Sequence, residues 1–95
     1  MAMENPGIDD GELRRMIQDL VVEVLRHKKI TVTPEAVKEG VSLTRDLGLD
    51  SLDALQLSAT VEKRYKLKFS DEDIRAMDDL GSIMRVVRKQ VPPAP

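Results

Sequence analysis

Apolar residues recur at alternating steps of three and four in the first third of the chain, as on one face of an amphipathic helix. This stripe consists of Leu13, Met16, Ile17, Leu20, Val21, Val24 and Leu25. Asp9 and Glu12 stand three residues apart as a capping pair. Arg26, Lys28 and Lys29 follow the stripe and suit the negative end of the helix dipole. The pattern therefore predicts a helix that begins near Asp9 and ends among these basic residues.

The periodicity weakens over residues 30–50. Thr33-Pro34-Glu35 predicts one helical turn that stops at Gly40, because proline is favoured at the first position of a helix. Five apolar residues are spaced along the segment and would pin it to a core: Val37, Val41, Leu43, Leu47 and Leu49. We therefore expect a long, ordered loop. Such a loop is unusual in a small bundle unless something functional sits at its end.

The next helix, predicted from about Ser51 to Tyr65, carries two apolar stripes. Successive helical residues are rotated by about 100°. The stripe that we expect to face the core contains Ala54, Leu57, Val61 and Tyr65. The second stripe contains Leu52, Leu55 and Ala59. If the helix packs on one side only, this second stripe stays exposed and indicates a docking surface; the alternative is a helix that the bundle buries on both sides.

Two shorter helices are predicted in the last third of the chain. Ser70 and Asp73 form a capping box at the start of a short helix that runs to about Met77. Asp78 or Asp79 then caps a last helix. Its buried stripe contains Leu80, Ile83, Val86 and Val87. The predicted fold is all-α: a four-helix bundle with one short third helix and a long ordered loop between helices 1 and 2.

Composition limits the chain to a single domain. The 95 residues favour one domain over 9–91, with a flexible N-terminal tail at 1–8 and a C-terminal tail at 92–95, where Pro92-Pro93 ends the last helix. The chain has no cysteine, which excludes disulfides, cysteine-ligated zinc and a thiol nucleophile. No apolar run reaches the roughly 18 residues of a membrane span, and no signal-peptide core is present. We expect a cytoplasmic protein without membrane insertion.

The side chains offer no catalytic constellation. Asp50 and Asp53 flank Ser51 without a histidine, so a hydrolase triad is not assembled. His27, the single histidine, has no acidic or cysteine partner at ligand spacing. A general acid and base would also require a pocket that perturbs their pKa values, for which a small bundle has little room. We therefore expect that the protein is not an enzyme and has no metal site.

The segment DLGLDSLDALQL, from Asp46 to Leu57, places Ser51 at a helix start behind a glycine turn. The first N–H groups of a helix are unpaired and carry about half a positive charge, so they would hold a phosphodiester on that serine. Taken alone, Asp50 or Ser51 is read as a simple N-cap. In this context the Asp50-Ser51-Leu52 triplet resembles the phosphopantetheine-attachment segment of acyl carrier proteins. The resemblance extends to about Val87.

The resemblance implies a carrier domain with 4'-phosphopantetheine, taken from coenzyme A, attached at Ser51. The arm would hold acyl intermediates as thioesters in fatty-acid, lipid or polyketide biosynthesis. The implied partners are a phosphopantetheinyl transferase and the acyl-transferring, condensing and modifying enzymes of one pathway. Together with the second stripe, the resemblance places partner contacts at Asp50, Leu52, Asp53, Leu55, Gln56 and Ala59. We expect the carrier to be a monomer.

Charge departs from the family pattern after Glu62. Four acids and no base lie between Asp46 and Glu62, but the segment 63–68 then has four bases and no acid. Carriers of primary fatty-acid synthesis are typically acidic along this helix and into its end, and Gln56 stands where they usually have glutamate. Because complementary charge governs partner choice, the difference favours a specialised pathway.

Three other functions remain open at this point. A carrier of aminoacyl or peptidyl groups would use the same serine, although acids around it are more typical of acyl carriers. An unmodified helical adaptor would bind protein through the stripe of Leu52, Leu55 and Ala59. Nucleic-acid binding through segment 63–68 is weakly supported, because the patch is short and the chain has a net charge of −2.

Overall fold

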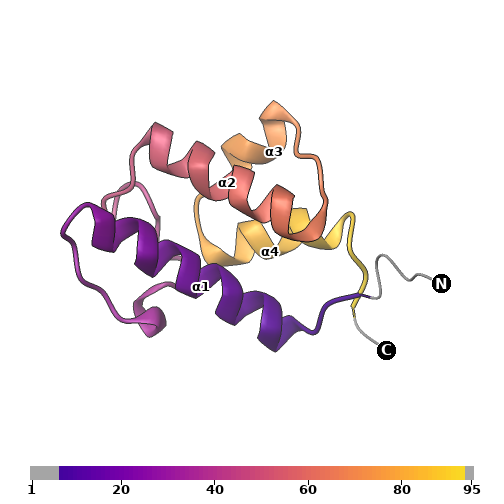
Figure 1. Cartoon of the computed structure of the whole chain (residues 1–95), viewed down its shortest axis with the longest axis horizontal. Coiled ribbons are helices and arrows are strands. Elements are labelled where there is room, and N and C mark those ends of the chain that lie inside the picture. The colour runs from indigo at the N-terminus through magenta and orange to yellow at the C-terminus, as the bar shows by residue number, and fades with distance from the viewer. Residues whose placement is uncertain (1–6, 94–95) are drawn as a thin grey trace.

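The computed structural model describes residues 7–93. It contains, in order, α1 (Asp10–His27), the 3-10 turn η1 (Pro34–Ala36), α2 (Ser51–Tyr65), α3 (Asp71–Ala76) and α4 (Leu80–Arg88). α1 contacts both α2 and α4, and the short α3 contacts the same two helices from the other side (Figure 1). The predicted all-α bundle, with a short third helix and a long loop after the first helix, is confirmed.

The core is formed by one face of each of the three longer helices. Their fully or nearly fully buried side chains are Leu13, Ile17, Val21 and Leu25 of α1, Leu57 and Val61 of α2, and Leu80, Ile83, Val86 and Val87 of α4. On α1 these residues recur every four positions and therefore share one face. Met16, Leu20 and Val24 are partly buried at its edges. Asp9 begins α1 by accepting hydrogen bonds from the amides of Gly11 and Glu12.

The long loop is pinned to the rest of the domain by apolar and polar contacts. Val37, Leu43 and Leu49 are buried, as their spacing predicts. The carboxylate of Asp78, between α3 and α4, accepts hydrogen bonds from the hydroxyls of Ser42 at 2.6 Å and of Thr44 at 3.0 Å. These contacts fix the loop at the end of the bundle from which α2 starts.

Asp79, rather than Asp78, caps α4. Its carboxylate accepts from the Ser82 amide at 2.9 Å, and it also accepts from the Gly40 amide at 2.7 Å. Gly40 has a φ of +85°, a left-handed conformation that favours glycine. The sequence left the two aspartates as equal candidates; in the fold one caps the helix and the other holds the loop.

The two ends of the described chain lie together. The Ile8 amide donates to the Pro92 carbonyl at 3.0 Å, and the guanidinium of Arg88 donates to the Ile8 carbonyl and to Asp10. α4 ends at Arg88, earlier than the expected stop at Pro92 and Pro93. The tails expected at 1–8 and 92–95 thus include residues that pair with each other, while 1–6 and 94–95 lie outside the described residues.

Candidate functional site

Ser51 is the first residue of α2 and lies where the long loop ends. Gly48 has a φ of +98° and makes the turn before the helix, and Leu49 is buried just after it. The side chain of Ser51 is exposed. The local sequence therefore anchors the chain on one side of the serine and leaves the serine itself exposed.

Asp50 and Asp53 form a complete capping box around Ser51. The Asp50 carboxylate accepts from the Asp53 amide at 3.0 Å, and the Asp53 carboxylate accepts from the Asp50 amide at 3.0 Å. Of the two candidate N-cap residues in this triplet, Asp50 is the cap. The hydroxyl of Ser51 is therefore not required to begin the helix.

A third charged residue, Lys28, reaches this turn from the C-terminal cap of α1. Its Nζ lies 2.6 Å from Asp53 Oδ2, 3.2 Å from the Gly48 carbonyl oxygen and 3.5 Å from Asp50 Oδ2. The hydrogen bond between the two side chains lowers the pKa of Asp53 and raises the pKa of Lys28. The sequence indicates only that Lys28 suits the negative end of the helix dipole. Its contact with Asp53 could not be predicted, because the two residues lie 25 positions apart.

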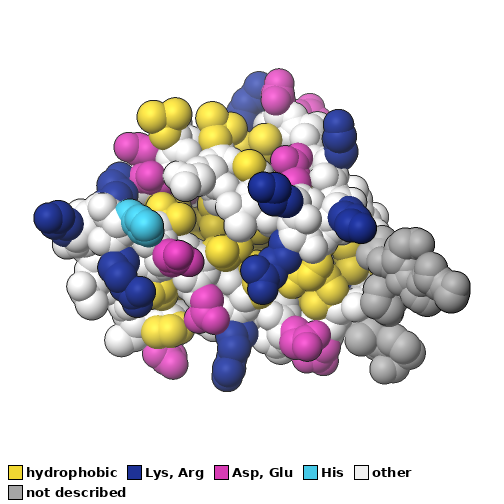
Figure 2. Space-filling model, in the orientation of Figure 1, with side chains coloured by type: hydrophobic (Ala, Val, Ile, Leu, Met, Phe, Trp, Pro, Cys, Tyr) yellow, Lys and Arg dark blue, Asp and Glu magenta, His cyan; other side chains and the backbone are white. Residues whose placement is uncertain are grey.

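The two stripes of α2 lie on different surfaces. Leu57 and Val61 are buried and Ala54 and Tyr65 are partly buried, whereas Leu52 is 75% exposed and Leu55 is 50% exposed. Gln56 and Ala59 are also exposed. Figure 2 shows apolar side chains at the surface over the start of α2, beside acidic groups. Helix burial on both sides, the alternative for this helix, is excluded within the described domain.

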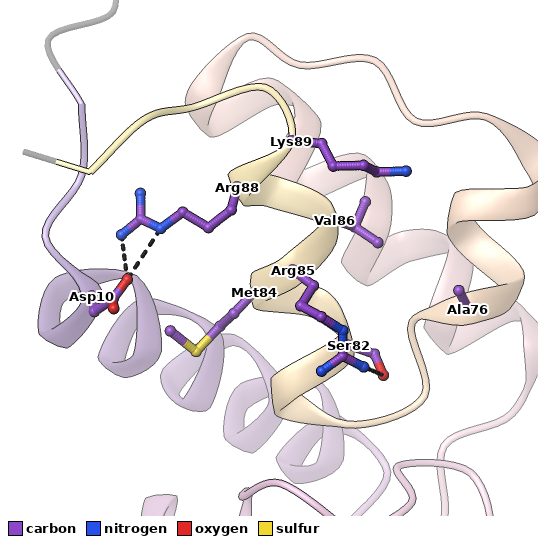
Figure 3. Close-up of a pocket in the computed structure, with 8 residues that line it drawn as sticks. All are labelled: Asp10, Ala76, Ser82, Met84, Arg85, Val86, Arg88 and Lys89. Atoms are coloured by element: carbon purple, nitrogen blue, oxygen red, sulfur yellow. Dashed lines mark hydrogen bonds and ion pairs between the residues drawn. The ribbon is translucent and has the colours of Figure 1, made fainter.

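A cavity of about 500 Å³ opens between α2 and α3, and Ser51 is one of its lining residues. Its apolar lining comes from Ala54, Leu55, Ile74 and Met77, and its polar lining from Thr44, Arg75 and Asp78. The serine thus stands beside a space with a mainly aliphatic wall. A larger cavity of about 780 Å³ lies over α4, where Arg88 pairs with Asp10 (Figure 3), and contains no residue of α2.

The described residues hold no cluster of three or more histidine, cysteine, aspartate or glutamate side chains arranged to bind a metal. Among the same residues, no helix has the length and apolar character that a membrane crossing requires. The site is therefore made of one exposed hydroxyl, a charged helix start and an exposed apolar strip.

Comparison with known proteins agrees with this arrangement. The family model described as "Phosphopantetheine attachment site" matches residues 15–88. The acyl carrier protein of Wolinella succinogenes is 32% identical over 71 residues, which cover 75% of this chain and 87% of that protein. The acyl carrier protein of Campylobacter curvus is 29% identical over 73 residues, and that of Chlamydia muridarum 31% identical over 62 residues. These matches cover 77% and 65% of this chain, and 88% and 80% of the two relatives. The chain belongs to the phosphopantetheine-binding carrier family, and it is a non-catalytic, acyl-carrier-protein-like domain.

Proposed function

We propose that Ser51 carries the 4'-phosphopantetheine arm and that the protein holds acyl intermediates for fatty-acid, lipid or polyketide biosynthesis. The observation that supports this best is the position of Ser51: it is exposed, it is the first residue of a 15-residue helix, and Asp50 takes the capping role. The amides of the first turn favour a negatively charged phosphodiester there. The thiol at the end of the arm supplies the thioester chemistry.

Loading is a phosphoryl-type transfer to the Ser51 hydroxyl. The serine oxygen forms a new bond to the arm's phosphorus in coenzyme A, and adenosine 3',5'-bisphosphate leaves with the electron pair of the broken P–O bond. The serine proton passes to a base of the transferase. The chain itself contributes the exposed hydroxyl and a helix start that attracts the product phosphodiester.

The cavity between α2 and α3 fits an aliphatic cargo. Its wall contains Ala54, Leu55, Ile74 and Met77, and Ser51 is also one of its lining residues. An acyl chain that folds back along the arm would exchange water for this aliphatic wall, which is favourable in proportion to the apolar area buried. The cavity therefore supports an acyl cargo more than a polar aminoacyl one.

The exposed residues at the start of α2 form the proposed contact surface for the transferase and the pathway enzymes. Leu52 and Leu55 supply its apolar part, and Asp50 and Gln56 lie beside them. Ala59 continues the strip toward the basic end of the helix. A cytoplasmic location and a monomeric state remain predictions from the sequence.

Mass spectrometry of the intact protein tests the attachment. Incubation of the unmodified protein with coenzyme A, magnesium and a broad-specificity phosphopantetheinyl transferase should add one phosphopantetheinyl group, and Ser51→Ala should abolish the addition. Ser70→Ala removes an exposed serine from the cap of α3 and should still be loaded. If several active transferases leave the wild type unchanged, the unmodified adaptor becomes the better proposal.

A further inference from the structure

The acids at the start of α2 differ in their access to solvent. The Asp50 side chain is 63% exposed, whereas that of Asp53 is 16% exposed beneath the Lys28 ammonium group. Both aspartates flank the serine in sequence, so sequence alone makes them equivalent. In the fold, Lys28 Nζ lies 2.6 Å from Asp53 Oδ2 and 3.5 Å from Asp50 Oδ2, so Asp53 is the more closely paired acid.

The capping box of Asp50 and Asp53 does not depend on the contact between Lys28 and Asp53. Asp53 Oδ2 accepts from the Asp50 amide as well as from Lys28 Nζ, and Asp50 caps the Asp53 amide. The capping box therefore remains complete without the lysine. Removing the lysine charge should change the electrostatic field at Ser51 and leave the helix start in place.

The location of the pair makes it part of the surface that a partner meets. A cavity of about 390 Å³ lies between α1 and α2, with Leu20, Val24 and Leu57 as its apolar wall. Lys28, Asp53 and Gln56 also line it. Lys28 thus lies where α1 meets the exposed residues of α2.

We propose that Lys28 is a specificity-determining residue, which neutralises Asp53 and leaves Asp50 as the partner-facing acid beside Ser51. A protein that binds the attachment turn then meets one exposed carboxylate, that of Asp50, which Lys28 Nζ contacts only at 3.5 Å, instead of two. Such a surface favours partners that recognise the turn through Leu52 and Leu55, and it weakens attraction to strongly basic partners, because charge complementarity acts mainly on encounter. The proposal rests on the proposed loading of Ser51.

Loading kinetics of charge variants test the proposal. Lys28→Met keeps most of the length of the side chain and removes its charge, so the KM of a basic transferase for the carrier should fall about fivefold at low salt, the order expected for one unit charge at contact range in water. The kcat should stay unchanged, and the gain should shrink at high salt. Lys28→Arg should restore wild-type behaviour.

Two further variants separate masking of Asp53 from a general effect of net charge. Lys29→Met removes the adjacent, exposed lysine and should leave KM unchanged. In an Asp53→Asn background, Lys28→Met should lower KM clearly less than in the wild type, because no Asp53 carboxylate is released. An equal gain from Lys29→Met, or an undiminished gain in the Asp53→Asn background, would overturn the proposal.

The pKa of the Asp53 carboxyl, followed by NMR, provides a readout that does not depend on loading. It should rise toward its ordinary value in Lys28→Met and stay low in Lys29→Met. If this pKa rises in Lys28→Met but the wild type is never loaded, the ion pair is confirmed and the proposed function is wrong. If loading is normal but Lys28→Met changes neither this pKa nor KM, the inference about Lys28 is wrong while the carrier function stands; a raised pKa with unchanged KM also overturns it.

Discussion

The two apolar stripes of α2 differ in exposure although one helix carries both. Leu57 is 4% exposed and belongs to the core, while Leu55, only two positions earlier, is 50% exposed beside the proposed attachment serine. Burial of the first stripe stabilises the fold, whereas the second stripe leaves apolar surface in water and contributes little to stability. The comparison indicates that inward residues of this helix hold the domain together, whereas the outward residues are free for the recognition role proposed for them.

Truncation of one leucine from each stripe should have the largest effect on stability. Leu57→Ala should lower the free energy of unfolding by about 2–5 kcal/mol, because it opens a cavity in the core. Leu55→Ala should cost clearly less, since half of its surface is already in water. Urea denaturation of both variants measures the difference. Equal losses would mean that α2 is buried on both sides in solution.

At the start of α2, the neighbouring residues Asp50 and Ser51 should also differ in their contribution to stability. Asp50→Ala removes the cap and should cost roughly 0.5–2 kcal/mol in unfolding free energy. Ser51→Ala should change the unfolding free energy by less than about 0.5 kcal/mol, since the hydroxyl is exposed and does not cap. Thermal unfolding of the unmodified proteins compares them. A larger loss from Ser51→Ala than from Asp50→Ala would contradict the assignment of the cap.

Asp78, which holds the long loop, should make the stability of the fold depend on pH. Burial acts to raise the pKa of Asp78, but hydrogen bonds from Ser42 and Thr44 outweigh it and lower this pKa overall. A carboxyl with a lower pKa in the folded state contributes stability above its unfolded pKa of about 3.9 and loses it as pH falls through the folded value. The unfolding free energy should therefore decline below about pH 4.

Asp78→Asn should be less stable than the wild type at neutral pH and should show a shallower decline in acid. Asp50→Asn, at an exposed carboxylate, provides the comparison. Denaturant titrations of the three proteins between neutral pH and about pH 2.5 measure both effects. The same acid dependence in Asp78→Asn and the wild type would remove the loop contact as its source.

The features that could be predicted from the sequence depend on residues that lie close together along the chain. The limits of α2, its two stripes and the capping box of Ser70 with Asp73 all follow from residues within a few positions of one another. The contact of Lys28 with Asp53 and that of Asp78 with Ser42 could not be predicted in this way. Each joins residues more than 20 positions apart, so it depends on how helices and loop pack.

The two ends of α2 give the smallest and most specific expected effect. Asp50 caps the helix and Asp53 lies in its first turn, whereas the exposed Lys63 and Arg64 lie in its last turn. A basic groove that recognises a uniformly acidic helix would attract Asp50 and repel Lys63 and Arg64, which slows association more than it changes the chemical step. We therefore expect this carrier to be a poor substrate for a malonyl transferase of housekeeping fatty-acid synthesis.

Reversing the charge at the basic end should improve that reaction. Gln56→Glu combined with Lys63→Glu and Arg64→Glu should raise kcat/KM of the loaded carrier several-fold, mainly through association and more at low salt than at high salt. Arg15→Glu with Arg26→Glu adds negative charge at exposed positions of α1 and should not reproduce the gain. Steady-state kinetics at two ionic strengths compare the proteins. A wild type that already matches a housekeeping carrier, or a triple variant that is no better, would show that the basic end of α2 has no role in discrimination. The proposal of a specialised pathway would then lose the support of the charge of α2.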